Sequence, residues 1–176
     1  RLSPTEANSL RMRSLLWEMF QKQPWDQRTA RYAAAEVLAD GDPDGMARFL
    51  DTWEGANGPT EWSVFLRGYA ALQRGVPDEA KAYLLEAWAM NPRWQTAYNL
   101  AIIARYSLKY REALEFLRLA ENVLTKDSDR EQGTRARVRT QIARVLYEQG
   151  DYVAARREAE YATSLDNGSS EAHLIL

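Results

Sequence analysis

The sequence predicts an all-α protein made of antiparallel helix pairs, and three observations lead to this prediction. Glycine and proline divide the 176-residue chain into segments of helical length. No segment alternates apolar and polar residues as a half-buried strand would. The segments also come in pairs that repeat along the chain, which is the sequence pattern of a stacked repeat protein.

The first helix is predicted over residues 4–22. Ser3, Pro4 and Glu6 supply a cap residue, a proline at the first helical position and a capping-box glutamate, and the helix ends before Pro24. Helices at about 25–39 and 43–54 follow, and the Asn57-Gly58-Pro59 sequence then breaks the chain. Further helices are predicted at about 60–74, 77–90, 94–107, 110–125, 133–149 and 152–165, with a last helical start at Ser170-Glu171-Ala172.

The repeat is visible in the spacing of small residues around the breaks. In 68–80 and 143–155, a small residue lies seven positions before a glycine and an alanine lies five after it. Ala101, Lys109 (in place of the glycine) and Ala113 give a copy between them, and Gly41 with Met46 gives a degenerate copy. Equivalent positions are separated by 34 residues (Met46 to Ala80), 33 (Ala80 to Ala113) and 42 (Ala113 to Ala155). The longer last spacing predicts about eight extra residues around 126–133.

This pattern resembles the tetratricopeptide repeat, with matches at Ala80, Ala87, Pro92, Leu100, Ala101, Ala113, Ala120, Ala155 and Ala162. Arg67, Lys109 and Asn167 depart from it, since the family usually has leucine, glycine and proline there. The resemblance implies an α-solenoid, a right-handed superhelix of helix pairs with a concave surface. Its predicted parts are an N-terminal helix that caps the array or belongs to a preceding repeat (1–24), a degenerate pair (25–58), three repeats (61–93, 94–133 with an extended loop, and 134–168) and a truncated further helix (169–176).

Composition excludes several classes of function. A net charge of −2 and a pI near 5.6 give no electrostatic reason to expect nucleic acid or an anionic membrane as partner. The chain has no cysteine, which excludes disulfides and cysteine metal sites. No apolar run approaches the roughly 20 residues that span a bilayer. Both ends suggest a piece of a longer protein, so cytoplasm and periplasm both stay open, and the alanine- and arginine-rich composition suggests a bacterial source.

No residue constellation points to catalysis, so we expect neither an enzyme nor a cofactor. His173 is the single histidine, and the nine glycines are scattered at turns rather than gathered in a phosphate-binding loop. A Ser-His-Asp arrangement would depend on His173 alone. The acidic residues are expected to be solvated charges on helix surfaces.

Two segments leave an alternative open. Residues 40–45 have the D-x-D-x-D-G spacing of a calcium loop, but Asp51 stands at the twelfth position, where a glutamate normally supplies two oxygens. We prefer a turn in which Asp42 caps a helix that has Pro43 at its first position. The charged segment 126–133 is interpreted as a solvated extension between helices, with a partner-docking loop as the alternative.

The family resemblance implies that the first helix of each pair lines a partner-binding groove. The implied groove residues are Trp62, Phe65, Tyr69, Tyr98, Asn99, Ile102, Arg105, Tyr106, Arg137, Gln141, Arg144 and Tyr147. Tyrosine, tryptophan and arginine dominate binding energy at interfaces. A partner peptide or helix with apolar and acidic residues would therefore match this groove. Of the set with which some family members bind chaperone tails only Asn99 and Arg137 are present, so that ligand is not expected. The alternative function is self-association through the solenoid ends.

Overall fold

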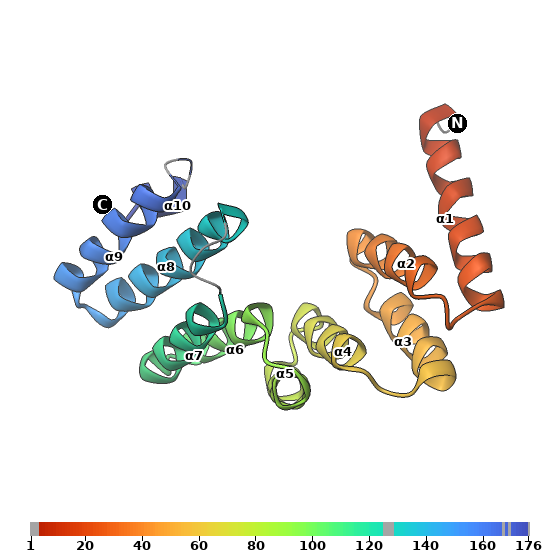
Figure 1. The fold of residues 1–176 in the computed structure, drawn as a ribbon, viewed down its shortest axis with the longest axis horizontal. Helices are drawn as coiled ribbons and strands as arrows, with labels where there is room; N and C mark the ends of the chain where they lie inside the picture. The colour runs from red at the N-terminus through yellow and green to blue at the C-terminus, as the bar shows by residue number, and fades with distance from the viewer. Residues whose placement is uncertain (1–3, 125–128, 167, 169, 176) are drawn as a thin grey trace. The chain divides into compact units, whose positions relative to one another are not determined.

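The computed structural model describes residues 4–124, 129–166, 168 and 170–175. These residues form ten α-helices and no strand, which confirms the predicted all-α class (Figure 1). The chain divides into two compact units, unit 1 (Arg1–Met90) and unit 2 (Asn91–Leu176). Within the described part, no helix combines the length and the apolar character needed to cross a membrane.

Unit 1 contains α1 (Pro4–Lys22), α2 (Gln27–Asp40), α3 (Pro43–Asn57), α4 (Glu61–Gln73) and α5 (Pro77–Met90). Helix α2 begins at Gln27 rather than Trp25, because the Asp26 carboxylate accepts hydrogen bonds from the backbone N–H groups at 28 and 29 and so caps the helix. Asp42 caps α3 in the same way, with Pro43 at the first helical position, as expected. Helix α3 runs three residues beyond its predicted end and stops at Gly58.

The core of unit 1 is aromatic. The rings of Phe20 and Phe49 stack with their centroids 4.6 Å apart, and neither side chain is exposed. Trp62 meets Phe49 edge-on at 5.9 Å and Trp53 at 5.3 Å. Phe20 therefore attaches α1 to the helix pairs that follow it.

Unit 2 contains α6 (Trp94–Tyr106), α7 (Tyr110–Val123), α8 (Asp129–Gln149), α9 (Tyr152–Leu165) and α10 (Ser170–His173). Helix α6 packs against α7, α8 packs against both α7 and α9, and α10 lies against α9 and α8. Helix α8 begins four residues earlier than predicted, so 129–133 is helical and not part of a solvated extension. Glu131 lies in its first turn, where the helix dipole favours an acidic residue. The rest of that predicted segment, 126–128, lies outside the described residues.

Three helix pairs are joined by the same turn. In each, the N–H of the turn residue donates to the carbonyl three residues earlier, and the next N–H donates to the carbonyl five residues earlier, which is a Schellman motif. The bonds are Gly75 to Leu72 and Val76 to Ala71 (both 3.0 Å), Leu108 to Arg105 and Lys109 to Ala104 (both 2.9 Å), and Gly150 to Tyr147 (3.0 Å) and Asp151 to Leu146 (2.9 Å). The repeat read from the sequence is therefore also a repeat of backbone geometry.

The structure corrects one position in this frame. The residue in the place of the glycine is Leu108, not Lys109, because Leu108 has φ 58°, beside 74° at Gly75 and 93° at Gly150. A side chain in the left-handed region brings its Cβ too close to the next carbonyl. Leu108 is 71% exposed, so packing of its side chain offsets little of this conformational cost.

Leu108→Gly is therefore expected to raise the free energy of unfolding by about 1 kcal/mol, the relief of the left-handed strain less the added freedom of the unfolded chain. The reciprocal control, Gly150→Ala, is expected to lower it by about 1 kcal/mol. Urea denaturation followed by circular dichroism measures both. If Leu108→Gly lowered stability as well, the leucine side chain would be supplying packing that outweighs its strain.

Candidate functional site

In unit 2, most of the groove residues implied by the sequence lie on α6 and α8, the first helices of two successive pairs. Tyr98, Asn99 and Ile102 are half-buried, and Arg137 is exposed. Tyr106 and Tyr147 present most of their rings to solvent, with exposed fractions of 75% and 53%. These two exposed tyrosines form an aromatic surface at the C-terminal ends of α6 and α8.

Two arginines lie over tyrosine rings of α6. The Arg137 guanidinium carbon is 5.8 Å from the centre of the Tyr98 ring, and that of Arg105 is 4.5 Å from the Tyr106 ring. Burial raises the pKa of the Tyr98 hydroxyl above its ordinary value of 10.0, against the opposing charge of Arg137. Tyr98 is therefore a neutral phenol at physiological pH and can donate a hydrogen bond.

A pocket of about 430 Å³ opens beside Tyr106 and Tyr147. It is lined by Arg105, Tyr106, Arg144, Tyr147, Glu148, Glu171, Leu174 and Ile175. Two ion pairs cross it, Arg105 with Glu148 at 2.7 Å and Arg144 with Glu171 at 2.8 Å. The side-chain amide of Gln141 also donates to Glu171, at 3.0 Å. The pocket thus combines paired charges with exposed apolar surface.

The sequence did not single out four of these lining residues, Glu148, Glu171, Leu174 and Ile175. Three of them lie in or just after α10, which the sequence predicted only as a helical start. The signal was present, because a further repeat beginning near Glu171 places its first helix beside α8. Extending the groove pattern to that helix would have found Glu171.

In unit 1, the implied groove residues are Trp62, Phe65 and Tyr69, all on α4. Trp62 and Phe65 are partly buried against the aromatic core of that unit. Tyr69 is half-buried. Trp62 and Phe65 therefore contribute to the packing of α4 on α3, whatever surface they offer to a partner.

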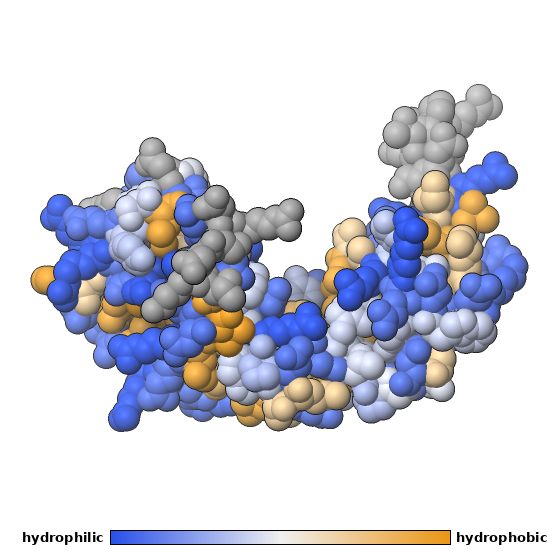
Figure 2. Space-filling model, viewed as in Figure 1, coloured by the Kyte–Doolittle hydropathy of each residue, from blue (hydrophilic) through white to orange (hydrophobic). Residues whose placement is uncertain are grey.

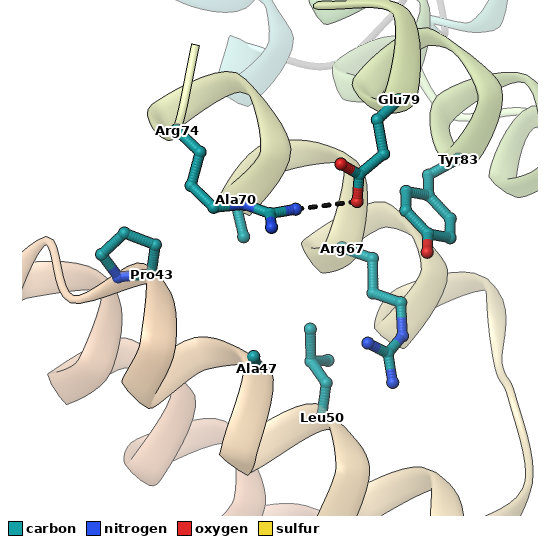
Figure 3. A pocket seen from close by; sticks show the side chains of 8 residues that line it. All are labelled: Pro43, Ala47, Leu50, Arg67, Ala70, Arg74, Glu79 and Tyr83. Atoms are coloured by element: carbon teal, nitrogen blue, oxygen red, sulfur yellow. Dashed lines mark hydrogen bonds and ion pairs between the residues drawn. The ribbon is translucent and has the colours of Figure 1, made fainter. Parts of the chain in front are cut away.

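Unit 1 has a smaller pocket of about 120 Å³ between α3, α4 and α5 (Figure 3). Its arginines are already paired: Arg74 with Glu79 at 2.8 Å, and Arg67 with Glu54 and Asp51, each at 3.0 Å. The hydrogen bond to Glu54 and the nearby Asp51 raise the pKa of the Arg67 guanidinium, against its partial burial. The repeat pattern usually has leucine at position 67. Here Arg67 stands in its place and connects α4 to α3 by ion pairs. Both arginines of this pocket are therefore used in contacts between helices, and the pocket provides little free charge for a charged ligand.

The segment that resembled a calcium loop forms a turn. Asp40 pairs with Arg13, and Asp42 accepts from the backbone N–H of Asp44 at 3.1 Å and from Arg48 at 3.4 Å. Gly41 between them adopts the left-handed conformation that ends α2. The described residues contain no group of three or more metal-ligating side chains.

Comparison with known proteins identifies the fold. No protein-family model matches the chain, and no curated protein matches it. Among solved structures, it is similar to the Cut9-Hcn1 hetero-tetramer of the APC/C (17% identity, TM-score 0.76, 93% of this chain) and to TTC0263, a thermophilic TPR protein from Thermus thermophilus (13%, 0.70, 97% of this chain and 91% of that one). It is also similar to YrrB, described as a TPR protein with an unusual peptide-binding site (16%, 0.65, 91% of this chain and 79% of that one).

The chain has the tetratricopeptide repeat fold. It spans 32% of the matched Cut9-Hcn1 chain, about a third of that length. The likeness shows the fold, and the tetratricopeptide pairs explain why first helices such as α6 and α8 lie next to each other.

Proposed function

We propose that the chain is a non-catalytic interaction module that binds a peptide or a helix of a partner protein on the first helices of unit 2. In this proposal it acts as a scaffold or adaptor in a larger complex. The observation that carries the proposal is the pair of exposed tyrosines, Tyr106 and Tyr147, at the rim of a pocket that also holds Arg105 and Arg144. Tyrosine and arginine are the residue types that dominate binding energy at protein interfaces.

The side chains of this surface indicate which chemical groups a partner should carry. Exposed tyrosine rings offer contact area to apolar side chains at a small cost in conformational entropy. The nearby guanidinium groups donate hydrogen bonds to carboxylate or carbonyl oxygens. A segment that carries apolar anchors and acidic residues fits both. The peptide-binding site named for YrrB, a protein of the same fold, supports a peptide as the class of ligand.

The double substitution Tyr106→Ala/Tyr147→Ala is expected to abolish capture of the partner, since removing two interface tyrosines commonly lowers affinity about 100-fold or more. The domain would be immobilised, exposed to lysate of the source cells, and its retained proteins identified by mass spectrometry. Tyr161→Ala is the matched control, because Tyr161 is a partly exposed tyrosine on α9, the second helix of its pair.

We expect the wild type and the Tyr161→Ala variant to retain the same partner and the double variant to lose it. Circular dichroism should show equal helix content in all three, since both substituted rings are largely exposed. Equal retention by the double variant would place the binding surface elsewhere on the molecule.

A second candidate function, self-association, is favoured by the surface of α1. Met12, Leu15 and Met19 follow one another at helical spacing on this helix and are 60%, 47% and 55% exposed. Hydrophobic residues are visible on the described part of α1 in Figure 2. A stripe of this kind suits a helix–helix contact. A mass that stays monomeric in sedimentation over a hundredfold range of concentration would exclude this candidate.

A further inference from the structure

Arg105 is a buried cation with incomplete hydrogen bonding. It is 8% exposed, and its Nη1 donates to Glu148 at 2.7 Å. Its Nε is buried and has no acceptor within the described part of the chain. A buried donor without a partner lowers stability, so a ligand that supplies the acceptor recovers free energy on binding.

Two other partly buried arginines of this protein show what Arg105 lacks. Arg67 binds the carboxylates of Glu54 and Asp51, and Arg139 binds those of Glu121 and Glu158 at 2.8 Å each. Each thus connects its own helix to two carboxylates. Arg105 is more buried than either, yet the structure gives it a single carboxylate, that of Glu148.

Arg105 lines the pocket of unit 2 together with Tyr106, Tyr147 and the aliphatic side chains of Leu174 and Ile175. The Nε and Nη2 edge of a guanidinium group is planar and matches the two oxygens of a carboxylate. The other arginine of the pocket, Arg144, also pairs with one carboxylate, that of Glu171, but its side chain is 38% exposed and water can complete its hydrogen bonds. Arg105 is therefore the buried cation of this pocket that lacks an acceptor, and apolar and aromatic side chains surround it.

We propose that this pocket is a subsite for the side-chain carboxylate of an aspartate or glutamate in the partner, bound at the Nε edge of Arg105, with a neighbouring apolar side chain of the partner between Tyr106 and Tyr147. This inference rests on the proposed function and makes it more specific. The partner's carboxylate takes the place that a second acidic side chain takes at Arg67 and Arg139. Arg105 becomes the specificity-determining residue, and the two tyrosines supply contact area.

The test uses a library of random 12-residue peptides joined at their C-termini to a phage coat protein, so that no peptide carries a free C-terminal carboxylate. Wild-type protein is expected to enrich peptides with aspartate or glutamate next to an apolar residue. In the selected peptide, changing that acid to its amide should weaken binding about tenfold or more, since charge-assisted hydrogen bonds are the strong ones. The same change should alter binding to the Arg105→Gln variant less than about twofold.

Two further variants keep the test decisive if Arg105→Gln does not fold. Arg105→Lys keeps the positive charge but removes the Nε–H, and it should reduce the preference for the acid over the amide. Glu148→Gln leaves Arg105 without its internal carboxylate, so it should bind the acidic peptide more tightly than the wild type does. Weaker binding by Glu148→Gln would overturn the inference.

The outcomes separate the two proposals. Selected peptides without an acidic preference that are lost in Tyr106→Ala/Tyr147→Ala would overturn the carboxylate subsite and leave the interaction surface standing. An acidic preference of equal size in the wild type and in both Arg105 variants would assign the carboxylate to another cation and overturn the inference. A library that yields no binding peptide would count against both proposals.

Discussion

Replacing Phe20 by alanine is expected to lower the free energy of unfolding of unit 1 by about 3–5 kcal/mol. The ring is fully buried, stacks on Phe49 and lies 5.6 Å from the ring of Trp17. Its removal takes away the transfer free energy of a phenyl group and leaves a cavity that flat neighbouring rings fill poorly. Because Phe20 is the one buried residue among the described side chains of α1 and stacks on Phe49 of α3, the substitution should also loosen α1 from α3.

Urea denaturation followed by tryptophan fluorescence measures this effect, since Trp17, Trp53 and Trp62 all lie in or against the same core. Met19→Ala is the matched control one residue earlier. That side chain is largely exposed, and its loss should change stability by less than about 0.5 kcal/mol. If the two variants unfolded at the same urea concentration, α1 would not be held by the aromatic core.

The helices of this protein could be predicted because their signals are local. The local signals include an aspartate before α3 with proline as its first residue, the glycine after α2 and the Asn57-Gly58-Pro59 break. Each acts on the backbone within a few residues. The spacing of small residues predicted the pairing as well, since close packing of two helices requires them at fixed positions. The same spacing carried the resemblance to the tetratricopeptide repeat, whose fold the structure has.

The composition of the pocket in unit 2 could not be predicted in this way. Its ion pair joins Arg105 to Glu148, 43 residues further along the chain, and no local pattern shows which of many acidic residues an arginine will meet. The frame failed at Leu108 for another reason: the replacement of the glycine was placed at Lys109, although the position seven residues after Ala101 and five before Ala113 is Leu108. Tertiary contacts decide the ion pair, whereas the turn at Leu108 is local.

The same distinction explains the aromatic residues of α4. The family resemblance assigned Trp62 and Phe65 to a groove, but a position on the first helix of a pair does not tell a residue that packs on the preceding pair from one that faces a ligand. Unit 1 has an aromatic core at that point, supplied by Phe49 and Trp53, and it holds both rings partly buried. Tyr106, at the C-terminal end of α6, was assigned by the same resemblance and is exposed.

Replacing Gly68 by valine is expected to lower the free energy of unfolding by about 2 kcal/mol, by overfilling the contact between α4 and α5. A Cβ atom at this position would lie 2.8 Å from Cγ of Leu84 and 3.2 Å from the backbone oxygen of Ala80. Leu84 and Ala80 are fully buried, so neither can move aside without displacing its own neighbours. The gain in helix propensity over glycine, about 0.5 kcal/mol, is too small to offset this.

Gly55→Val separates the steric effect from the propensity of the helix. Gly55 lies within α3, as Gly68 lies within α4, but no atom comes within 4 Å of a Cβ built there. Its substitution should therefore leave stability unchanged or raise it by a few tenths of a kcal/mol. Thermal and urea unfolding of the two variants give the difference directly. Equal effects would mean that α4 and α5 can separate to admit a side chain, and that the small residue is not what allows the helices of this pair to approach so closely.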